Sequence, residues 1–223
     1  MFAALARRWQ QRGVVPTAVV VEAGRASRVR RRLSQLRHRQ DDSAGLCGRL
    51  GWPVISVTAI NDSSAVAAVA RTAPDVAVNA GAGILHKPIL GLPTLGTLGT
   101  HMGVLPAYRG MNVAEWAAFN GDPVGCSVFW IDDGIDTGDI AATRVVDAAG
   151  CRTIEALRGR VNEAQLDLYA ETLAGVLAHG RGAPRPQAAG EGRQFYRMHA
   201  DLRALLERRL AASHGGEASH LNS

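Results

Sequence analysis

Short apolar runs alternate with helical patterns through the first part of the chain. Apolar runs that suit buried strands lie at 16–24, within 52–60 and at 75–83. The segments with a helical spacing of apolar residues lie at 24–40, 43–51 and 61–74. This order of strands and helices predicts right-handed crossovers and a mostly parallel sheet with helices on both faces. We therefore expect an α/β fold whose ligand crevice lies beyond the carboxyl ends of the strands.

The second part of the chain predicts a strand pair and three helices. The expected elements are a helix at 112–119, strands at 126–134 and 139–147, a long helix at 153–180 and a terminal helix at 199–214. The two strands are expected to form an antiparallel pair around an acidic loop. We expect a break in the long helix near Gly159, a linker over 181–193, and fraying over 215–223.

The beginning of the chain differs from what such a sheet requires. Residues 1–13 have a helical pattern, although a doubly wound sheet places a strand before its first helix. We therefore expect the first strand of the sheet and its glycine turn to be missing. A truncated or misassigned start and a fold that does without this strand are both consistent with the sequence.

The length and composition are those of one α/β domain with a short appendage. The 223 residues are 47% hydrophobic and include 25 glycines and nine prolines, and they can bury a substantial core. The chain has no continuous apolar run of transmembrane length, and arginines stand too early for a signal peptide, so a cytoplasmic protein is expected. The three cysteines lack metal-binding spacing and are predicted to be structural thiols.

Arginine supplies almost all of the positive charge behind the net charge of +5. Seven arginines and no acidic residue stand in the stretch 24–40. Such a block could bind nucleic acid or a phosphorylated ligand. A solvated helix face is the favoured interpretation, because Val29, Leu33 and Leu36 have helical spacing and no aromatic residues are interleaved with the arginines.

His101 and Asp136 each lie near the end of a predicted strand, where the ligand crevice is expected. A histidine titrates near neutral pH, and a carboxylate within hydrogen-bond reach would fix its tautomer and stabilise its cation. Such a pair suits proton transfer during attack of an amine on a carbonyl-like carbon. The alternative is a structural histidine in a glycine-rich turn. The aspartates around Asp136 lack the spacing of a calcium loop, so no metal site is predicted.

The segments "HMGVLPAYRG" and "AEWAAFNGDPVGCSVFWIDDGIDTGDI" resemble the core of the folate-dependent formyltransferase family. This family includes glycinamide ribonucleotide transformylase, methionyl-tRNA formyltransferase and sugar N-formyltransferases. Its usual run is Asn-x-His-x-Ser-x-Leu-Pro-x-Tyr-Arg-Gly, followed later by an Asp-x-Gly in an acidic loop. The resemblance implies a Rossmann-like formyltransferase fold, with a catalytic domain over 1–180 and a linker plus C-terminal helix over 181–223.

The resemblance implies a role for each matching residue. His101 matches the catalytic histidine and Asp136 the catalytic aspartate, which in the family assist formyl transfer from 10-formyltetrahydrofolate to an amine through a tetrahedral intermediate. The residues implied to line the folate site are Gly81, Ile84, Leu85, Leu105, Asp132, Asp133, Gly134 and Ile135. The implied substrate-binding residues are Tyr108, Arg109, Gly110 and Asn112. A strand end with glycines also lets a flat heterocycle approach backbone groups closely.

The chain departs from the family pattern at two positions next to His101. The family's catalytic asparagine is Gly99 here, and its serine is Gly103. The asparagine hydrogen-bonds the formyl oxygen, and losing one oxyanion donor typically costs about 2.7 to 4 kcal/mol. Three outcomes are open: a donor such as Thr100, Asn112 or a backbone N–H replaces it, the chemistry is altered, or catalysis is lost.

The leading expectation is an enzyme that moves a formyl group from 10-formyltetrahydrofolate to an amine of a small metabolite, such as an amino sugar, an amino acid or a natural-product intermediate. Hydrolysis of the formyl folate and non-catalytic binding of a folate or metabolite are the alternatives.

The same resemblance limits which amine acceptors and which binding partners are expected. Methionyl-tRNA is not expected, because family members that use it carry a C-terminal barrel for which the residues after Gly180 leave no room. Glycinamide ribonucleotide is disfavoured, because its phosphate contacts use the glycine turn that is missing here. We expect no nucleic-acid or membrane partner. Apolar surface left by a missing strand would favour a homodimer.

Overall fold

The computed structural model describes residues 1–22 and 43–212. The predicted arginine-rich helix at 24–40 and the frayed end at 215–223 lie outside these described residues. The chain divides into two compact units, Met1–Leu98 and Gly99–Ser223. Both units combine helices with strands, and the parallel strand pairs outnumber the antiparallel one, so the fold is α/β as expected.

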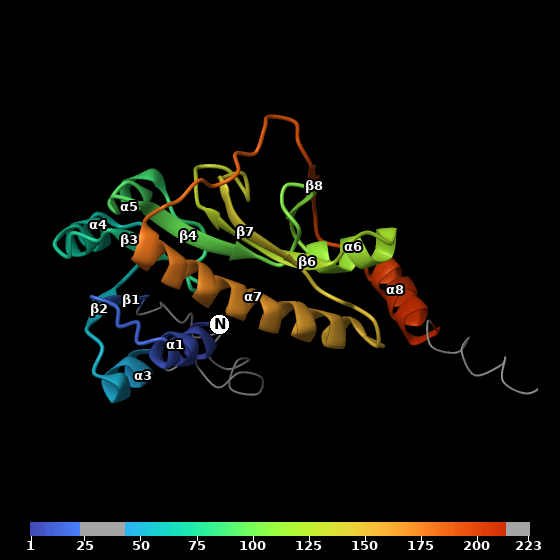
Figure 1. Ribbon diagram of the computed structural model, residues 1–223, viewed down its shortest axis with the longest axis horizontal. Coiled ribbons are helices and arrows are strands. Elements are labelled where there is room, and N and C mark those ends of the chain that lie inside the picture. Colours follow the sequence, from blue (N-terminus) through green and yellow to red (C-terminus); the bar gives the residue numbers. More distant parts are fainter. Residues whose placement is uncertain (23–42, 213–223) are drawn as a thin grey trace, which may run out of the picture. The chain divides into compact units, whose positions relative to one another are not determined.

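The N-terminal unit follows the predicted alternation of strands and helices (Figure 1). Its elements are α1 (Phe2–Gln11), β1 (Val19–Glu22), α3 (Ser43–Leu50), β2 (Val54–Val57), α4 (Ser63–Ala70), β3 (Val76–Val78), α5 (Lys87–Leu90) and the start of β4 (Gly96–His101). The β1 strand pairs in parallel with β2, and β3 pairs in parallel with the first residues of β4. Phe2 and Trp9 of α1 are buried beside Trp52, so the ring of Trp52 covers the apolar face of this helix.

The C-terminal unit holds the end of β4 and the rest of the chain. Its further elements are β5 (Tyr108–Gly110), α6 (Val113–Asn120), β6 (Gly125–Trp130), β7 (Ile140–Val145), α7 (Ile154–His179), β8 (Arg193–Phe195) and α8 (Ala200–Ala212). All six residues of β6 are buried, because this strand lies between β4 and β7. The β6 and β7 strands are antiparallel, which confirms the predicted pair around the acidic loop.

The long helix α7 packs against β6 and β7 and runs along this sheet (Figure 1). Leu157, Val161 and Leu168 are buried on its inner face. The break predicted near Gly159 is wrong, because α7 is continuous from Ile154 to His179. A glycine within a helix costs about 1 kcal/mol relative to alanine, which the packing of so long a helix overcomes. No helix in the described ranges is long and apolar enough to cross a membrane.

The segment expected to be a linker is part of the sheet structure. Arg185 exchanges two backbone hydrogen bonds of 2.8 Å with Ile140, and β8 pairs in parallel with β5. Sequence patterns did not predict β5 or β8, because neither Tyr-Arg-Gly nor Arg-Gln-Phe contains an apolar run like the one that indicated β3. The C-terminal part of the chain therefore builds onto the region around His101.

Candidate active site

His101 is the last residue of β4 and has an exposed fraction of only 8%. Its ring Nε2 lies 2.8 Å from the carbonyl oxygen of Tyr108. A carbonyl can only accept a hydrogen bond, so Nε2 carries a hydrogen and donates it. The backbone comes close here, since a Cβ built on Gly103 would lie 2.9 Å from Nε2 and 2.8 Å from the Tyr108 oxygen. Glycine at position 103 is therefore required by this turn.

Asp136 faces the other nitrogen of the same ring. Its Oδ2 lies 3.5 Å from His101 Nδ1 and accepts a hydrogen bond of 2.9 Å from the backbone N–H of Gly110. The backbone of Asp136 is left-handed, with φ +57°, which is uncommon for a residue with a side chain. Within the described residues Oδ1 accepts no hydrogen bond, so this oxygen is available to a reacting group.

The two ring nitrogens of His101 therefore both face hydrogen-bond acceptors. Nε2 faces the Tyr108 carbonyl and Nδ1 faces the Asp136 carboxylate. A ring with a hydrogen on each nitrogen would have a donor for each of these acceptors. The structure thus brings together the two residues that the sequence paired. This arrangement can give and take protons in general acid–base chemistry.

The Tyr108 side chain is buried and fully engaged away from His101. Its hydroxyl donates to the Asp122 carboxylate and accepts from the Asn120 side chain at 3.0 Å. Burial, followed by the hydrogen bond to Asp122, raises the pKa of Tyr108 above its ordinary value. Its ring stacks on Phe195 of β8 at 4.7 Å between centroids. Tyr108 therefore serves the site through its backbone carbonyl, and the predicted substrate contact by its side chain stays a prediction.

The other predicted substrate-binding residues form a supporting network. Gly110 holds Asp136, as described above, and Arg109 donates two hydrogen bonds to Gln187. Asn112 donates to Glu115 at 3.0 Å and accepts from the backbone N–H of Met198 at 3.1 Å. Gln187 was not singled out from the sequence. The prolines at 184 and 186 are a signal that could have identified its segment as extended rather than loosely linked.

The predicted folate-lining residues fall in both compact units. Gly81, Ile84 and Leu85 belong to the N-terminal unit, where Ile84 is 67% exposed. The acidic loop belongs to the C-terminal unit, where Asp132, Asp133, Gly134 and Ile135 are all exposed. Ile84 and Ile135 are exposed apolar side chains, one in each unit, and their predicted contacts with folate stay predictions.

Asp132 and Leu105, two of the predicted folate-lining residues of the C-terminal unit, both have contacts within that unit. Asp132 Oδ1 accepts hydrogen bonds from the Gly134 N–H at 3.0 Å and the Thr137 hydroxyl at 2.7 Å, so the loop carries its own internal turn. Leu105 is only 4% exposed and packs with Phe129 and Ile140 in the core. Leu105 therefore belongs to the core, and its predicted contact with folate stays a prediction.

Gly99 marks where the chain departs most from the family pattern. A Cβ built on Gly99 would lie 2.8 Å from Cγ1 of Ile131, so this isoleucine fills the space beside the glycine. The Thr100 hydroxyl donates to the backbone oxygen of Ser127 at 3.1 Å. Because Thr100 and Asn112 are both already engaged, a backbone N–H is the remaining candidate among the replacement donors considered from the sequence.

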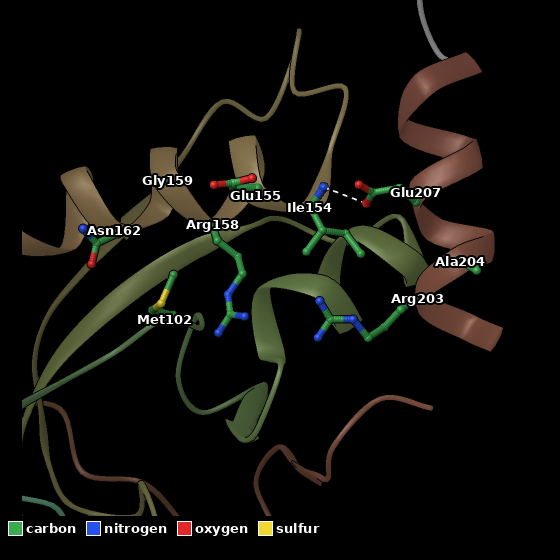
Figure 2. A pocket seen from close by; sticks show the side chains of 9 residues that line it. All are labelled: Met102, Ile154, Glu155, Arg158, Gly159, Asn162, Arg203, Ala204 and Glu207. Carbon is green, nitrogen blue, oxygen red and sulfur yellow. Dashed lines mark hydrogen bonds between the residues drawn. The ribbon is translucent and has the colours of Figure 1, made fainter. Parts of the chain in front are cut away.

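A groove of about 670 Å³ opens beside Met102, the residue after His101 (Figure 2). It lies between the first turns of α7 and one side of α8, and Figure 2 shows the side chains of Arg158 and Arg203 directed toward the same space. Both guanidinium groups approach one oxygen of Glu115, at 3.6 and 3.9 Å. Glu115 is 1% exposed, so two arginines here share one buried carboxylate.

Comparisons with known proteins identify relatives over most of the chain. The sequence model of the formyl transferase family matches residues 16–173. The methionyl-tRNA formyltransferase of Roseiflexus sp. (strain RS-1) is 36% identical over 151 residues, which cover 66% of this chain and 45% of that protein. The chain thus spans less than half of the length of this relative.

Solved structures of similar fold have lower sequence identity. Glycinamide ribonucleotide transformylase 1 from Symbiobacterium toebii has a TM-score of 0.61 at 20% identity, covering 84% of this chain and 89% of its own. The formyltransferase PseJ from Anoxybacillus kamchatkensis, crystallised with a UDP-linked formamido sugar and tetrahydrofolate, has a TM-score of 0.54 at 21% identity and covers 68% of this chain and 80% of its own. These likenesses show a Rossmann-like fold. Because the family model matches more than half of the sequence, the chain belongs to the folate-dependent formyltransferase family.

Proposed function

We propose that this protein transfers a formyl group from 10-formyltetrahydrofolate to the amine of a small metabolite. The observation that carries the proposal is the placement of the His101 ring between the Asp136 carboxylate and the Tyr108 carbonyl. Membership of the family supports formyl transfer as the reaction. The tetrahydrofolate in the PseJ structure supports a folate as the donor.

The proposed reaction exchanges one carbon–nitrogen bond for another. The acceptor amine attacks the formyl carbon, and a tetrahedral intermediate forms. Asp136 Oδ1 accepts the proton that the amine loses, and His101 supplies a proton from Nδ1, the ring nitrogen that is not bonded to the Tyr108 carbonyl, to the departing folate nitrogen. The products are a formamide and tetrahydrofolate. The protonated His101, which faces Asp136, also stabilises the negative charge that develops on the formyl oxygen.

The groove beside Met102 is our candidate for the acceptor site. One of its lining residues, Met102, directly follows His101 in the chain. Arg158 and Arg203 line this groove together with the carboxylates of Glu155 and Glu207, and both arginines also approach the buried Glu115. Guanidinium groups bind carboxylate and phosphate oxygens well. We therefore propose a small polar amine, whose amino group suits the carboxylates of Glu155 and Glu207 and whose oxygen atoms suit the two arginines, a description that an amino acid or an amino sugar meets.

Mass spectrometry of reaction products tests the proposed function. The purified protein is incubated with 10-formyltetrahydrofolate and a pooled library of amines, and tetrahydrofolate, formate and amines heavier by one CO unit are scored. We expect tetrahydrofolate to appear together with a formylated amine. Formate without a formylated amine would instead establish a hydrolase.

A non-catalytic folate-binding protein is the second candidate function. It is favoured by one observation, the Ile131 side chain beside Gly99, where the family has a catalytic asparagine. Binding of the folate without formation of tetrahydrofolate in the same experiment would support this candidate.

A further inference from the structure

We propose that Gln187 is a positioning residue that holds Asp136 beside His101. The inference rests on the proposed function, because it concerns the same pair of residues. The Gln187 side-chain amide donates to the backbone oxygens of Gly138 at 2.6 Å and Asp136 at 3.1 Å. Its oxygen accepts hydrogen bonds from Arg109 Nη2 at 2.8 Å and Nε at 3.0 Å. Both ends of the amide are therefore used.

Hydrogen bonds from Gln187 and from Gly110 reach two different groups of Asp136, its carbonyl and its carboxylate. Gly110, the neighbour of Arg109, donates its N–H to the Asp136 carboxylate at 2.9 Å. Gln187 binds the Asp136 carbonyl at one end and Arg109 at the other. One side chain thus links the acidic loop to the β5 strand, so that the carboxylate and the carbonyl of Asp136 are both held from outside the loop.

Asp136 needs such support because of its surroundings. Its backbone is left-handed, and residues 132–135 before it are exposed. A residue with a side chain keeps this conformation only where neighbouring structure holds it. The carboxylate must also stay within reach of His101 Nδ1, since small displacements of catalytic groups reduce rates strongly. Gln187 supplies hydrogen bonds at the point where the loop turns back toward β7.

The segment that carries Gln187 is itself fixed. We define residues 181–195 as the C-terminal strap. Arg181 pairs with Asp139 at 3.1 Å, directly after the acidic loop. Arg185 pairs with Ile140 through two backbone hydrogen bonds, and the end of the strap forms β8 against β5. The strap is therefore attached on both sides of Gln187, and its amide has a defined position.

Three variants test the role of Gln187. Gln187→Leu removes both ends of the amide, and Gln187→Glu keeps the oxygen that faces Arg109 but loses the donor to Asp136. Gln11→Leu is the control, because Gln11 is exposed at the end of α1 and its side chain makes no hydrogen bond with the described residues. Thermal unfolding of each protein verifies that it is folded. The readouts are the nitrogen NMR resonances of the His101 ring, measured without substrate, and kcat, KM and folate affinity.

We expect Gln187→Leu and Gln187→Glu to shift the His101 ring resonances toward those of Asp136→Asn. We also expect kcat to fall roughly 10- to 100-fold, with folate affinity unchanged and Gln11→Leu like the wild type. Ring resonances that stay at wild-type positions in a folded Gln187→Leu protein would overturn the inference, as would a Gln187→Glu protein that matches the wild type. Shifted resonances in a protein without any formyl transfer would support the positioning role and count against the proposed function alone.

Discussion

The side chain of Ile131 fills the space beside Gly99, where a built Cβ would lie 2.8 Å from Ile131 Cγ1. This relationship explains how the chain accommodates a glycine at the position of the family's asparagine. Ile131 packs against the core cluster of Leu105, Phe129 and Ile140, so the isoleucine has an apolar support on its other side. A larger side chain at position 99 therefore requires the Ile131 side chain to shift or to be replaced by a smaller one.

We predict that the double variant Gly99→Asn/Ile131→Ala has a higher kcat than the wild type. The smaller residue makes room, and the new amide can donate to the developing oxyanion, a contribution worth roughly 100-fold or more in rate. Gly99→Asn alone should lose about 1 to 3 kcal/mol of unfolding free energy through overpacking. Steady-state kinetics and urea denaturation measure both effects. A double variant no faster than Ile131→Ala would show that the wild type already has a sufficient oxyanion donor.

Gly103→Ala is predicted to reduce both stability and activity. Its methyl group would meet the Tyr108 carbonyl oxygen at 2.8 Å and His101 Nε2 at 2.9 Å, so the hydrogen bond between them must move. We expect a loss of about 1 to 3 kcal/mol in the free energy of unfolding and a lower kcat. Gly175→Ala in α7 is the control, because its Cβ would meet nothing within 4 Å. That control should gain up to about 1 kcal/mol. Equal effects of the two substitutions would contradict the close approach at Gly103.

His101→Ala is predicted to abolish turnover and to leave folate binding largely intact. The ring supplies the acid–base group, and general acid–base catalysis typically contributes roughly 100- to 10,000-fold in rate. His101→Asn provides a second variant that keeps a polar side chain in this buried position. Product formation and folate affinity are measured in parallel. Activity that survives both substitutions would exclude His101 as the catalytic group.

The buried thiol of Cys126 is predicted to make the free energy of unfolding depend on pH in alkaline solution. Burial raises the pKa of Cys126 from its ordinary value of 9.0 to about 11. Between these two pH values the unfolded chain releases a proton that the folded chain retains. The contribution of the un-ionised thiol to the free energy of unfolding is therefore predicted to be complete below pH 9.0. From there to about pH 11 the free energy of unfolding is predicted to fall by about 1.4 kcal/mol per pH unit.

Cys126→Ala separates this thiol from the other groups that titrate in the same range. We expect the stability difference between the wild type and the variant to change across this range with that slope, because the remaining tyrosine, lysine and cysteine groups are common to both proteins. Urea denaturation at a series of pH values measures the difference. A difference independent of pH would show that the Cys126 thiol ionises at its ordinary pKa in the folded protein.

Much of the fold could be predicted because its signals are local. The alternating apolar runs indicated β1, β2 and β3, and alternating side chains indicated the antiparallel pair of β6 and β7. The proximity of His101 and Asp136 followed from the expectation that strand ends meet at one edge of a sheet. The strands β5 and β8 were missed, since their pairing depends on contacts between distant segments and their residues include no apolar run such as the valines of β3.

The details of the site depend on packing that no local pattern reports. Nothing around Gly99 in the sequence indicates that Ile131 lies beside it. Asn112 was proposed as a replacement donor, but its side chain is bound to Glu115 and Met198, which are contacts from two other parts of the fold. Gln187 was missed for the same reason, because its partners Arg109, Asp136 and Gly138 lie far from it in the sequence.

The fate of the formyl carbon tests the central claim most directly. 10-Formyltetrahydrofolate labelled with a carbon isotope in the formyl group is incubated with the wild-type protein, with His101→Ala and with an amine identified by mass spectrometry or, failing that, the amine pool. We predict that the label moves to a formamide with the wild type and stays on the folate with His101→Ala. A label that stays on the folate with the wild-type protein, although the folate binds, would contradict the assignment of formyl transfer to His101 and Asp136.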